Sequence, residues 1–205
     1  MKYTGPKNRL ARREGMDLGL KTPGSKSHTR LLKKLTVPPG QHGVQRRKKI
    51  SEHASQLREK QKLRTMFGIN ETQMKKYFKT ASQKKGNTAF YLAQFLEKRL
   101  DNAVYRLGYA PTRAAARQLV NHGHVTINNK RMNVPSYLVK VDDLITLNEK
   151  TAKIPYIEQS VSNKDNTVPQ WFDRKALTGK LLSEPDFDLI NRQIRLRLVV
   201  EFYSR

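Results

Sequence analysis

Two arginines at helical spacing are the side chains best suited to hold an anion. Arg113 and Arg117 are four residues apart, so a helix over about 112–122 would project them from one side, with Gln118 beside that face. No acidic residue lies in this stretch. Arginine binds phosphate oxygens bidentately, and no local carboxylate competes for either guanidinium. We therefore predict a phosphate-binding helix face, with a merely solvated surface as the alternative.

A predicted hairpin extends this basic surface. After Gly123 the apolar residues alternate with polar ones, and the Asn128-Asn129 pair favours a tight turn between two strands. Lys130, Arg131 and Lys140 lie on or just after this hairpin. A helix and a hairpin that both carry cations indicate a polyanion as the ligand.

The distribution of charge supports nucleic acid as that polyanion. The chain of 205 residues has 41 Lys and Arg against 17 Asp and Glu, a formal net charge of +24. Residues 1–50 carry +12 of this charge and residues 51–100 another +7. Charge that served only solubility would be spread more evenly, whereas a nucleic-acid-binding arm would be enriched in this way. An anionic membrane surface and an acidic protein are the two alternative partners for such a charge.

Composition excludes several kinds of chemistry. The absence of cysteine excludes disulfides, thiolate zinc sites and cysteine nucleophiles. No apolar run approaches the roughly 18 residues of a membrane span, and the first residues do not resemble a signal peptide, so we expect a soluble protein without membrane contact. His122 with His124 could suggest a metal site and Asp142 with Asp143 an acid pair. Chance or an RNA contact explains the first better, and a solvated turn the second. We predict no catalytic and no metal-binding residue.

The elements that position these residues can be read from periodicity and capping signals. Residues 1–45 mix Gly, Pro and basic residues and are predicted to form an extended basic arm. Helices are expected over Ser51 to Phe67, from Asn70 to about Lys84, and from Thr88 to Leu107. Strands are expected at 125–127, 132–134, 137–141 and 144–147. A looser region with Trp171-Phe172 follows, broken up by Pro155, Pro169 and Pro185. A strand-like alternation covers 194–202, and a short helix before it is equally allowed.

Several separated motifs carry a resemblance to a known family. The stretches Leu100-Asp101-Asn102, Ala116-Arg117-Gln118-Leu119-Val120 and His122-Gly123-His124-Val125 resemble the RNA-binding module named after small-subunit ribosomal protein four. Arg12-Arg13-Glu14-Gly15, the turn Pro38 to Gly43 and the final Val200 to Arg205 extend the similarity. The chain is thus identified as a bacterial-type member of this S-four family.

The resemblance implies a function and partners. Members of the family bind 16S ribosomal RNA directly, at a helix junction of its 5′ domain, and help to nucleate assembly of the 30S body. They contact protein S-five and other small-subunit proteins, line the path by which messenger RNA enters, and influence translational accuracy. The expected location is the ribosome of the bacterial cytoplasm, with a plastid as the alternative.

Two departures from the family pattern affect these expectations. Many members carry a cysteine zinc knuckle near the N-terminus, whereas this chain has Asn8 and Ala11 at matching positions. We therefore expect a zinc-free variant without cofactors, whose arm is held by packing and RNA. Asn129 and Asp142 stand where the family usually has glycine, and Asp142 should be the less comfortable in a left-handed turn.

The expected fold is α+β in two parts. A helical domain takes residues 46–94, completed by 190–205, and follows the basic arm 1–45. A domain at 95–189 contains the helix–hairpin module with its small antiparallel sheet, with a core at 97–160. The candidate rRNA-binding residues are Arg12, Arg13, Arg46, Arg47, Lys48, Lys49, Arg58, Lys60, Lys62, Arg64, Arg106, Arg113, Arg117, Gln118, His122, Lys130, Arg131 and Lys140.

Two other functions remain open from the sequence. A non-specific RNA chaperone would share the charge but not depend on RNA architecture. Pseudouridine synthases carry the same module, and Arg99-Leu100-Asp101 matches part of their catalytic motif. These residues lie inside the module's own first helix, however, and the C-terminal region is short for a catalytic domain.

Overall fold

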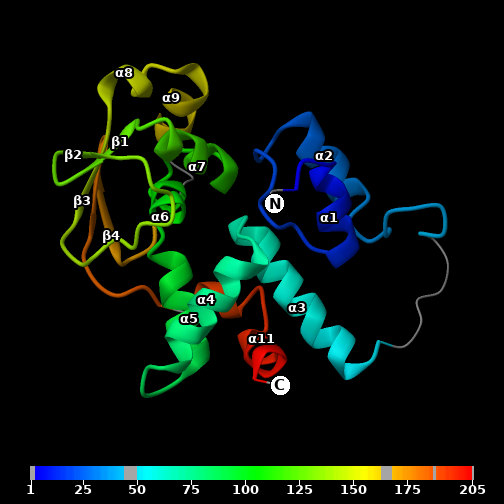
Figure 1. The fold of residues 1–205 in the computed structure, drawn as a ribbon. Coiled ribbons are helices and arrows are strands. Elements are labelled where there is room, and N and C mark those ends of the chain that lie inside the picture. The colour runs from blue at the N-terminus through cyan, green and yellow to red at the C-terminus, as the bar shows by residue number, and fades with distance from the viewer. Residues whose placement is uncertain (1–2, 44–49, 163–167, 187, 205) are drawn as a thin grey trace. The chain divides into compact units, whose positions relative to one another are not determined.

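The computed structural model describes residues 3–43, 50–162, 168–186 and 188–204 (Figure 1). The chain divides into two compact units, one formed by residues 1–92 with 187–205 and the other by residues 93–186. In this division the N-terminal 45 residues, expected as a separate arm, belong with the helical unit. The α+β fold class predicted from the sequence is confirmed: helices dominate, and the described strands form one antiparallel sheet.

The N-terminal region is more ordered than the sequence suggested. It contains two helices, α1 (Lys7–Glu14) and α2 (Lys26–Lys33). Ser25 caps α2 by accepting a hydrogen bond from the His28 amide, and α1 ends at Gly15 in the left-handed conformation. The prediction of an extended arm was therefore wrong here, because short helices form between the glycines and prolines that were read as breakers.

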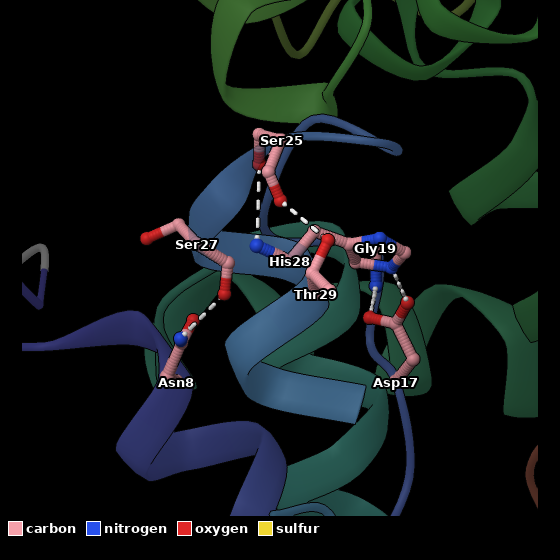
Figure 2. A network of polar contacts seen from close by, with 7 residues as sticks. All are labelled: Asn8, Asp17, Gly19, Ser25, Ser27, His28 and Thr29. Atoms are coloured by element: carbon pink, nitrogen blue, oxygen red, sulfur yellow. Dashed lines mark hydrogen bonds and ion pairs between the residues drawn. The ribbon is translucent and has the colours of Figure 1, made fainter. Parts of the chain in front are cut away.

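Polar contacts join α1, α2 and the loop between them (Figure 2). The Asn8 amide donates to the Ser27 carbonyl at 2.9 Å, and His28 Nε2 lies 2.8 Å from Asp17 Oδ2. Ala11 is fully buried on the inner side of α1. The two short helices are thus held to each other by hydrogen bonds and packing.

Three further helices complete this unit: α3 (Glu52–Phe67), α4 (Glu71–Ser82) and the C-terminal α11 (Leu196–Tyr203). The caps predicted from the sequence are present: Ser51 accepts from the Ala54 amide, and Asn70 from the Gln73 amide at 2.8 Å. Gly68 ends α3 in the left-handed conformation. These ends follow from local chemistry, which is why the sequence located them.

The C-terminal segment is a helix, so its strand-like prediction was wrong. Apolar residues alternate over 194–202, but Leu196 and Val199, three positions apart, are the buried pair. Their face packs on α3, and the Phe78 and Tyr203 rings lie 5.1 Å apart. The burial period is therefore helical, and α10 (Asp188–Asn191) precedes this helix.

The helix expected from Thr88 to Leu107 is two helices, α5 (Thr88–Glu97) and α6 (Leu100–Arg106). The break lies at Arg99, whose backbone is extended and forms a β-bridge with Leu138. On either side of it, the Leu100 amide donates to the Tyr137 carbonyl and the Val139 amide to the Lys98 carbonyl, both at 2.8 Å. The strand predicted at 137–141 is reduced to this single bridge.

The sheet has the strand order β2-β1-β3-β5-β4. As predicted, β1 (Val125–Ile127) forms a hairpin with the next strand, and β3 (Leu144–Leu147) pairs with β1. That next strand, β2 (Lys130–Met132), begins two residues before the strand expected at 132–134. The loose region expected after residue 150 instead contains α8 (Glu149–Ala152), α9 (Pro155–Ser162) and a second hairpin, β4 (Phe172–Lys175) with β5 (Thr178–Leu181).

Helix α6 lies close against this sheet. A Cβ at Gly179 of β5 would overlap the buried Leu107 side chain, so only glycine allows this approach. Helix α7 (Arg113–Asn121) packs on α6 in turn. The order of contacts is therefore sheet, α6, α7, which fixes where the basic face of α7 is presented.

Replacing Asp142 by glycine is expected to stabilise the protein. Asp142 has φ +73°, a left-handed conformation that costs a non-glycine residue about 1 kcal/mol, and its carboxylate makes only an exposed contact with Lys180. We expect the free energy of unfolding of the Asp142→Gly variant to rise by about 0.5–1 kcal/mol in chemical denaturation. Asp142→Ala should lower it, because alanine loses the contact and keeps the strain.

Candidate nucleic-acid interface

Helix α7 presents its basic side because its other side is buried. Thr112 caps the helix by accepting a hydrogen bond from the Ala115 amide at 3.2 Å. Ala116, Leu119 and Val120 are buried, whereas Gln118 and Asn121 are exposed and Arg117 is partly exposed. We define the α7–hairpin surface as the exposed or partly exposed residues Arg117, Gln118, His122, Lys130 and Arg131.

Arg131 joins the end of α7 to the hairpin. Its guanidinium donates to the His122 carbonyl at 3.1 Å and passes directly over Gly123, where a Cβ would overlap it. Gly123 also has φ +69°, so a left-handed backbone and a close side chain both require glycine here. The sequence predicted these residues as neighbours, and the fold brings them together.

Arg113 does not belong to this exposed set. Its Nε donates to Asn102 Oδ1 at 2.8 Å, and its guanidinium lies over the Tyr105 ring at 4.5 Å. Burial, and then the nearby charge of Arg106, lower the pKa of Arg113 to about 10. No carboxylate lies within α7 itself, as the sequence shows, but the charge of Glu97 from α5 acts on Arg113. Of the two arginines predicted to share one face, Arg113 is therefore held by contacts within the fold, whereas Arg117 lies on the surface.

Arg106 is likewise held by contacts within the fold. It makes a bidentate pair with Glu97, at 2.9 Å from Nε and 2.6 Å from Nη2. Asn102 also donates to Glu97, whose side chain has no exposed surface. Burial alone would raise the pKa of Glu97, but the charge and hydrogen bonds of Arg106 hold it below its ordinary value. The structure gives Arg106 a structural contact, and its role as a phosphate ligand stays a prediction.

The cations of α3 are also neutralised within the chain. Lys60 is buried, pairs with Glu71 at 3.0 Å and lies over the Phe202 ring. Its charge is therefore matched inside the fold, and its contact with RNA stays a prediction. Lys62 pairs with Glu59 at 2.6 Å. Arg58 and Arg64 are more exposed, but each has a carboxylate partner, Glu14 and Glu71 respectively.

The remaining candidates differ in their environments. Arg12 donates to the carbonyls of Val37 and Pro38, and so holds the turn that follows α2, whereas Arg13 is exposed. Lys140 is exposed beside the sheet. The basic run Arg46, Arg47, Lys48 and Lys49 lies outside the described residues.

Comparison with known proteins identifies the family of this chain. Residues 2–97 match the family model of the ribosomal protein S4/S9 N-terminal domain, and residues 98–145 match that of the S4 domain. The chain is 46% identical over 206 residues to small ribosomal subunit protein uS4A of Symbiobacterium thermophilum, a match that covers 100% of this chain and 99% of that protein. The chain belongs to the uS4 family.

Other bacterial members of the uS4 family are similar over the same length. The proteins of Desulfitobacterium hafniense and Aquifex aeolicus are 43% and 44% identical, each over 100% of this chain and 99% of their own. The family consists of structural components of the small ribosomal subunit. The resemblance stated from separated sequence motifs is therefore confirmed.

A uS4-type zinc knuckle does not fit the residues of this chain. Asn8 offers an amide that already donates to Ser27, and Ala11 offers a buried methyl group. Neither supplies the thiolate that such a knuckle requires. In the part of the chain that the structure describes, no three His, Cys, Asp or Glu side chains are grouped to hold a metal ion.

The motif that suggested an RNA-modifying enzyme is a structural feature of this uS4 domain. Arg99 chelates Asp101 with contacts of 3.0 and 2.6 Å, and both side chains are buried. Asp101 is thus enclosed rather than open to a substrate.

None of the described helices has the length and apolar character needed to cross a membrane.

The α3–α4 ion pairs should make this uS4 protein sensitive to acid. Burial opposes the charge of Glu71, but hydrogen bonds from Tyr203 and Lys60 lower its pKa below the ordinary value. This contribution to stability is present above that ordinary value, about 4.5, and is lost as pH falls through the lower folded pKa. We expect Glu71→Gln to lower the free energy of unfolding by about 1–2 kcal/mol at pH 6 and by much less at pH 3.

The measurement is chemical denaturation of both proteins across this pH range, followed by circular dichroism. Glu52→Gln is the matched control, because Glu52 is exposed at the start of α3. An equal deficit for Glu71→Gln at both pH values would show that the Glu71 pairs are not the source of the pH dependence.

Sequence reasoning missed one group of exposed cations in the helical unit. Lys75, Lys76 and Lys79 are exposed on α4, opposite its buried residues Met74 and Ala81. The signal was present, because the apolar stripe of α4 was located and its opposite face is rich in lysine.

Proposed function

We propose that this uS4 family member binds 16S ribosomal RNA directly, at a helix junction of the 5′ domain, and helps to nucleate assembly of the 30S body. The observation that carries the proposal is the full-length similarity to bacterial uS4 proteins. The α7–hairpin surface supports it, since exposed cations on a small rigid module suit phosphates and 2′-hydroxyls of folded RNA.

Further partners follow from the family resemblance. We propose contact with protein S-five and other small-subunit proteins, a position along the path by which messenger RNA enters, and an influence on translational accuracy. The proposed location is the ribosome of the bacterial cytoplasm. No catalytic activity and no cofactor form part of the proposal.

The test is binding to an isolated 5′-domain fragment of 16S RNA across a salt series, beside an unrelated structured RNA of equal length. If the protein recognises RNA architecture, the ribosomal fragment keeps a large advantage at physiological salt. If it neutralises about 6–10 phosphates, affinity falls roughly a thousandfold or more between 50 and 200 mM salt. Equal binding of both RNAs would contradict the proposal and favour a non-specific RNA chaperone.

A further inference from the structure

Helix α4 of the helical unit carries a cationic face that the family match does not assign. Lys75, Lys76 and Lys79 are exposed on α4, and we call them the α4 lysine face. Between Thr72 and Leu96 the sequence contains five lysines and no Asp or Glu. Among the described residues, none of the three lysines forms an ion pair within 4.0 Å with a carboxylate (Glu71, the nearest in sequence, pairs with Lys60).

Helices α3 and α4 differ in whether their cations have carboxylate partners. In sequence, α3 is the more obviously basic helix, but Arg58, Lys60, Lys62 and Arg64 all have carboxylate partners. Those pairs hold α3 to its neighbours or stabilise its own turns. The uncompensated positive charge of these two helices is therefore concentrated on α4 rather than on α3.

The chemistry of the face specifies the kind of ligand. Lysines 75 and 79 are one helical turn apart, and Lys76 lies beside them, so the three ammonium groups can address neighbouring phosphates. Phe78 of α4 is not available for base stacking, because it packs on Tyr203. Lysine acts as a flexible point charge without the planar fork that reads a base edge.

The turn after α4 extends the positive charge. The Tyr91 hydroxyl donates to the Lys85 carbonyl at 2.9 Å, and Lys84 lies over the Tyr91 ring at 5.0 Å. These contacts fold residues 83–86 back on α5 and fix Lys85 at the end of α4, where it is exposed. Exposed lysines thus occur both on the helix and on the turn that follows it.

We propose that the α4 lysine face docks the phosphate backbone of an A-form RNA duplex, as a contact separate from the α7–hairpin surface. The inference rests on the proposed function, since it assumes that RNA is the partner. It assigns to α4 a sequence-independent positioning contact, in place of the role that sequence alone gave to α3.

The test compares two triple variants that lose the same charge. Lys75→Ala, Lys76→Ala and Lys79→Ala remove the face and favour helix formation, so folding should be retained. Lys150→Ala, Lys153→Ala and Lys175→Ala remove three exposed lysines elsewhere. We expect the α4 variant to bind the 5′-domain RNA fragment at least tenfold more weakly near 150 mM salt, and its salt slope to fall by about 2–3. The control should change affinity less than about threefold and keep its slope.

A second readout needs no variant. Lysine acetylation of the full chain, with and without the RNA fragment, should show protection of Lys75, Lys76 and Lys79 and continued reactivity of Lys175. Unprotected α4 lysines in the RNA complex would overturn the inference and leave the face to another partner, such as an acidic protein. So would equal salt slopes for the two triple variants.

The two proposals can fail separately. If the unmodified protein binds ribosomal and unrelated RNA alike, the proposed function fails. If it prefers the ribosomal fragment but the α4 variant behaves like the control, only the docking role of α4 fails.

Discussion

Replacing Glu97 by alanine should lower the free energy of unfolding by about 3–5 kcal/mol, the cost of leaving one partner of a buried ion pair without its counter-charge. Glu97 has no exposed side-chain surface and accepts hydrogen bonds from Arg106 and Asn102. Without it, the Arg106 guanidinium would be unpaired, on a side chain that is only one-fifth exposed and close to the charge of Arg113. Glu97 of α5 is bound by two residues of α6, and α6 packs on α7. We therefore expect the loss of stability to involve the packing of all three helices.

Trp171, the only tryptophan, reports this unit, because it is buried at the start of the β4–β5 hairpin. Its fluorescence in urea should show a lower midpoint for Glu97→Ala. Glu184→Ala is the matched control: its carboxylate pairs with Lys98 at 2.7 Å but is half exposed, so it should cost less than about 1 kcal/mol. Equal costs for the two variants would mean that Arg106 finds solvent when Glu97 is removed.

Arg113→Glu and Arg117→Glu should have different effects, although the two arginines are one helical turn apart. Glutamate at 113 would be placed beside Glu97 and lose the contacts with Asn102 and Tyr105, so we expect a loss of about 3 kcal/mol or more in stability. Glutamate at 117 lies on the α7–hairpin surface. We expect it to cost about 1 kcal/mol at most in stability and to weaken RNA binding roughly tenfold.

Urea denaturation and RNA titration of each single variant separate the two effects. A double variant would not, because the unfolding caused at position 113 would mask the binding defect at 117. Arg113→Lys adds a graded control, since lysine keeps the charge but not the planar stacking on Tyr105. If Arg113→Glu were as stable as Arg117→Glu and bound RNA less well, Arg113 would be a phosphate ligand after all.

In this protein, a high density of basic residues in the sequence does not mean that their charges are uncompensated at the surface. The densest described helix in the sequence-based list was α3, with Arg58, Lys60, Lys62 and Arg64, and each of these has a carboxylate partner. Only the Glu59–Lys62 pair, three residues apart, could have been read locally. The partners of Arg58 and Lys60 lie 44 and 11 residues away.

Local chemistry explains what could be predicted. Helix ends at Ser51, Gly68, Asn70 and Thr112 depend on hydrogen bonds and backbone angles within four residues, so the sequence contained them in full. The β1–β2 turn depends likewise on adjacent asparagines with positive φ. Composition determined the net charge and the absence of thiol chemistry, and several ordered motifs identified the family.

Tertiary structure decided the rest, because the deciding interactions join residues far apart in the chain. The long helix predicted from Thr88 breaks at Arg99, where backbone hydrogen bonds from 137–139 compete with helical ones. The C-terminal alternation folds as a helix because α3 buries Leu196 and Val199 together. Whether a cation can meet RNA or is neutralised within the fold depends on the carboxylate brought beside it, and only the folded chain fixes that distance.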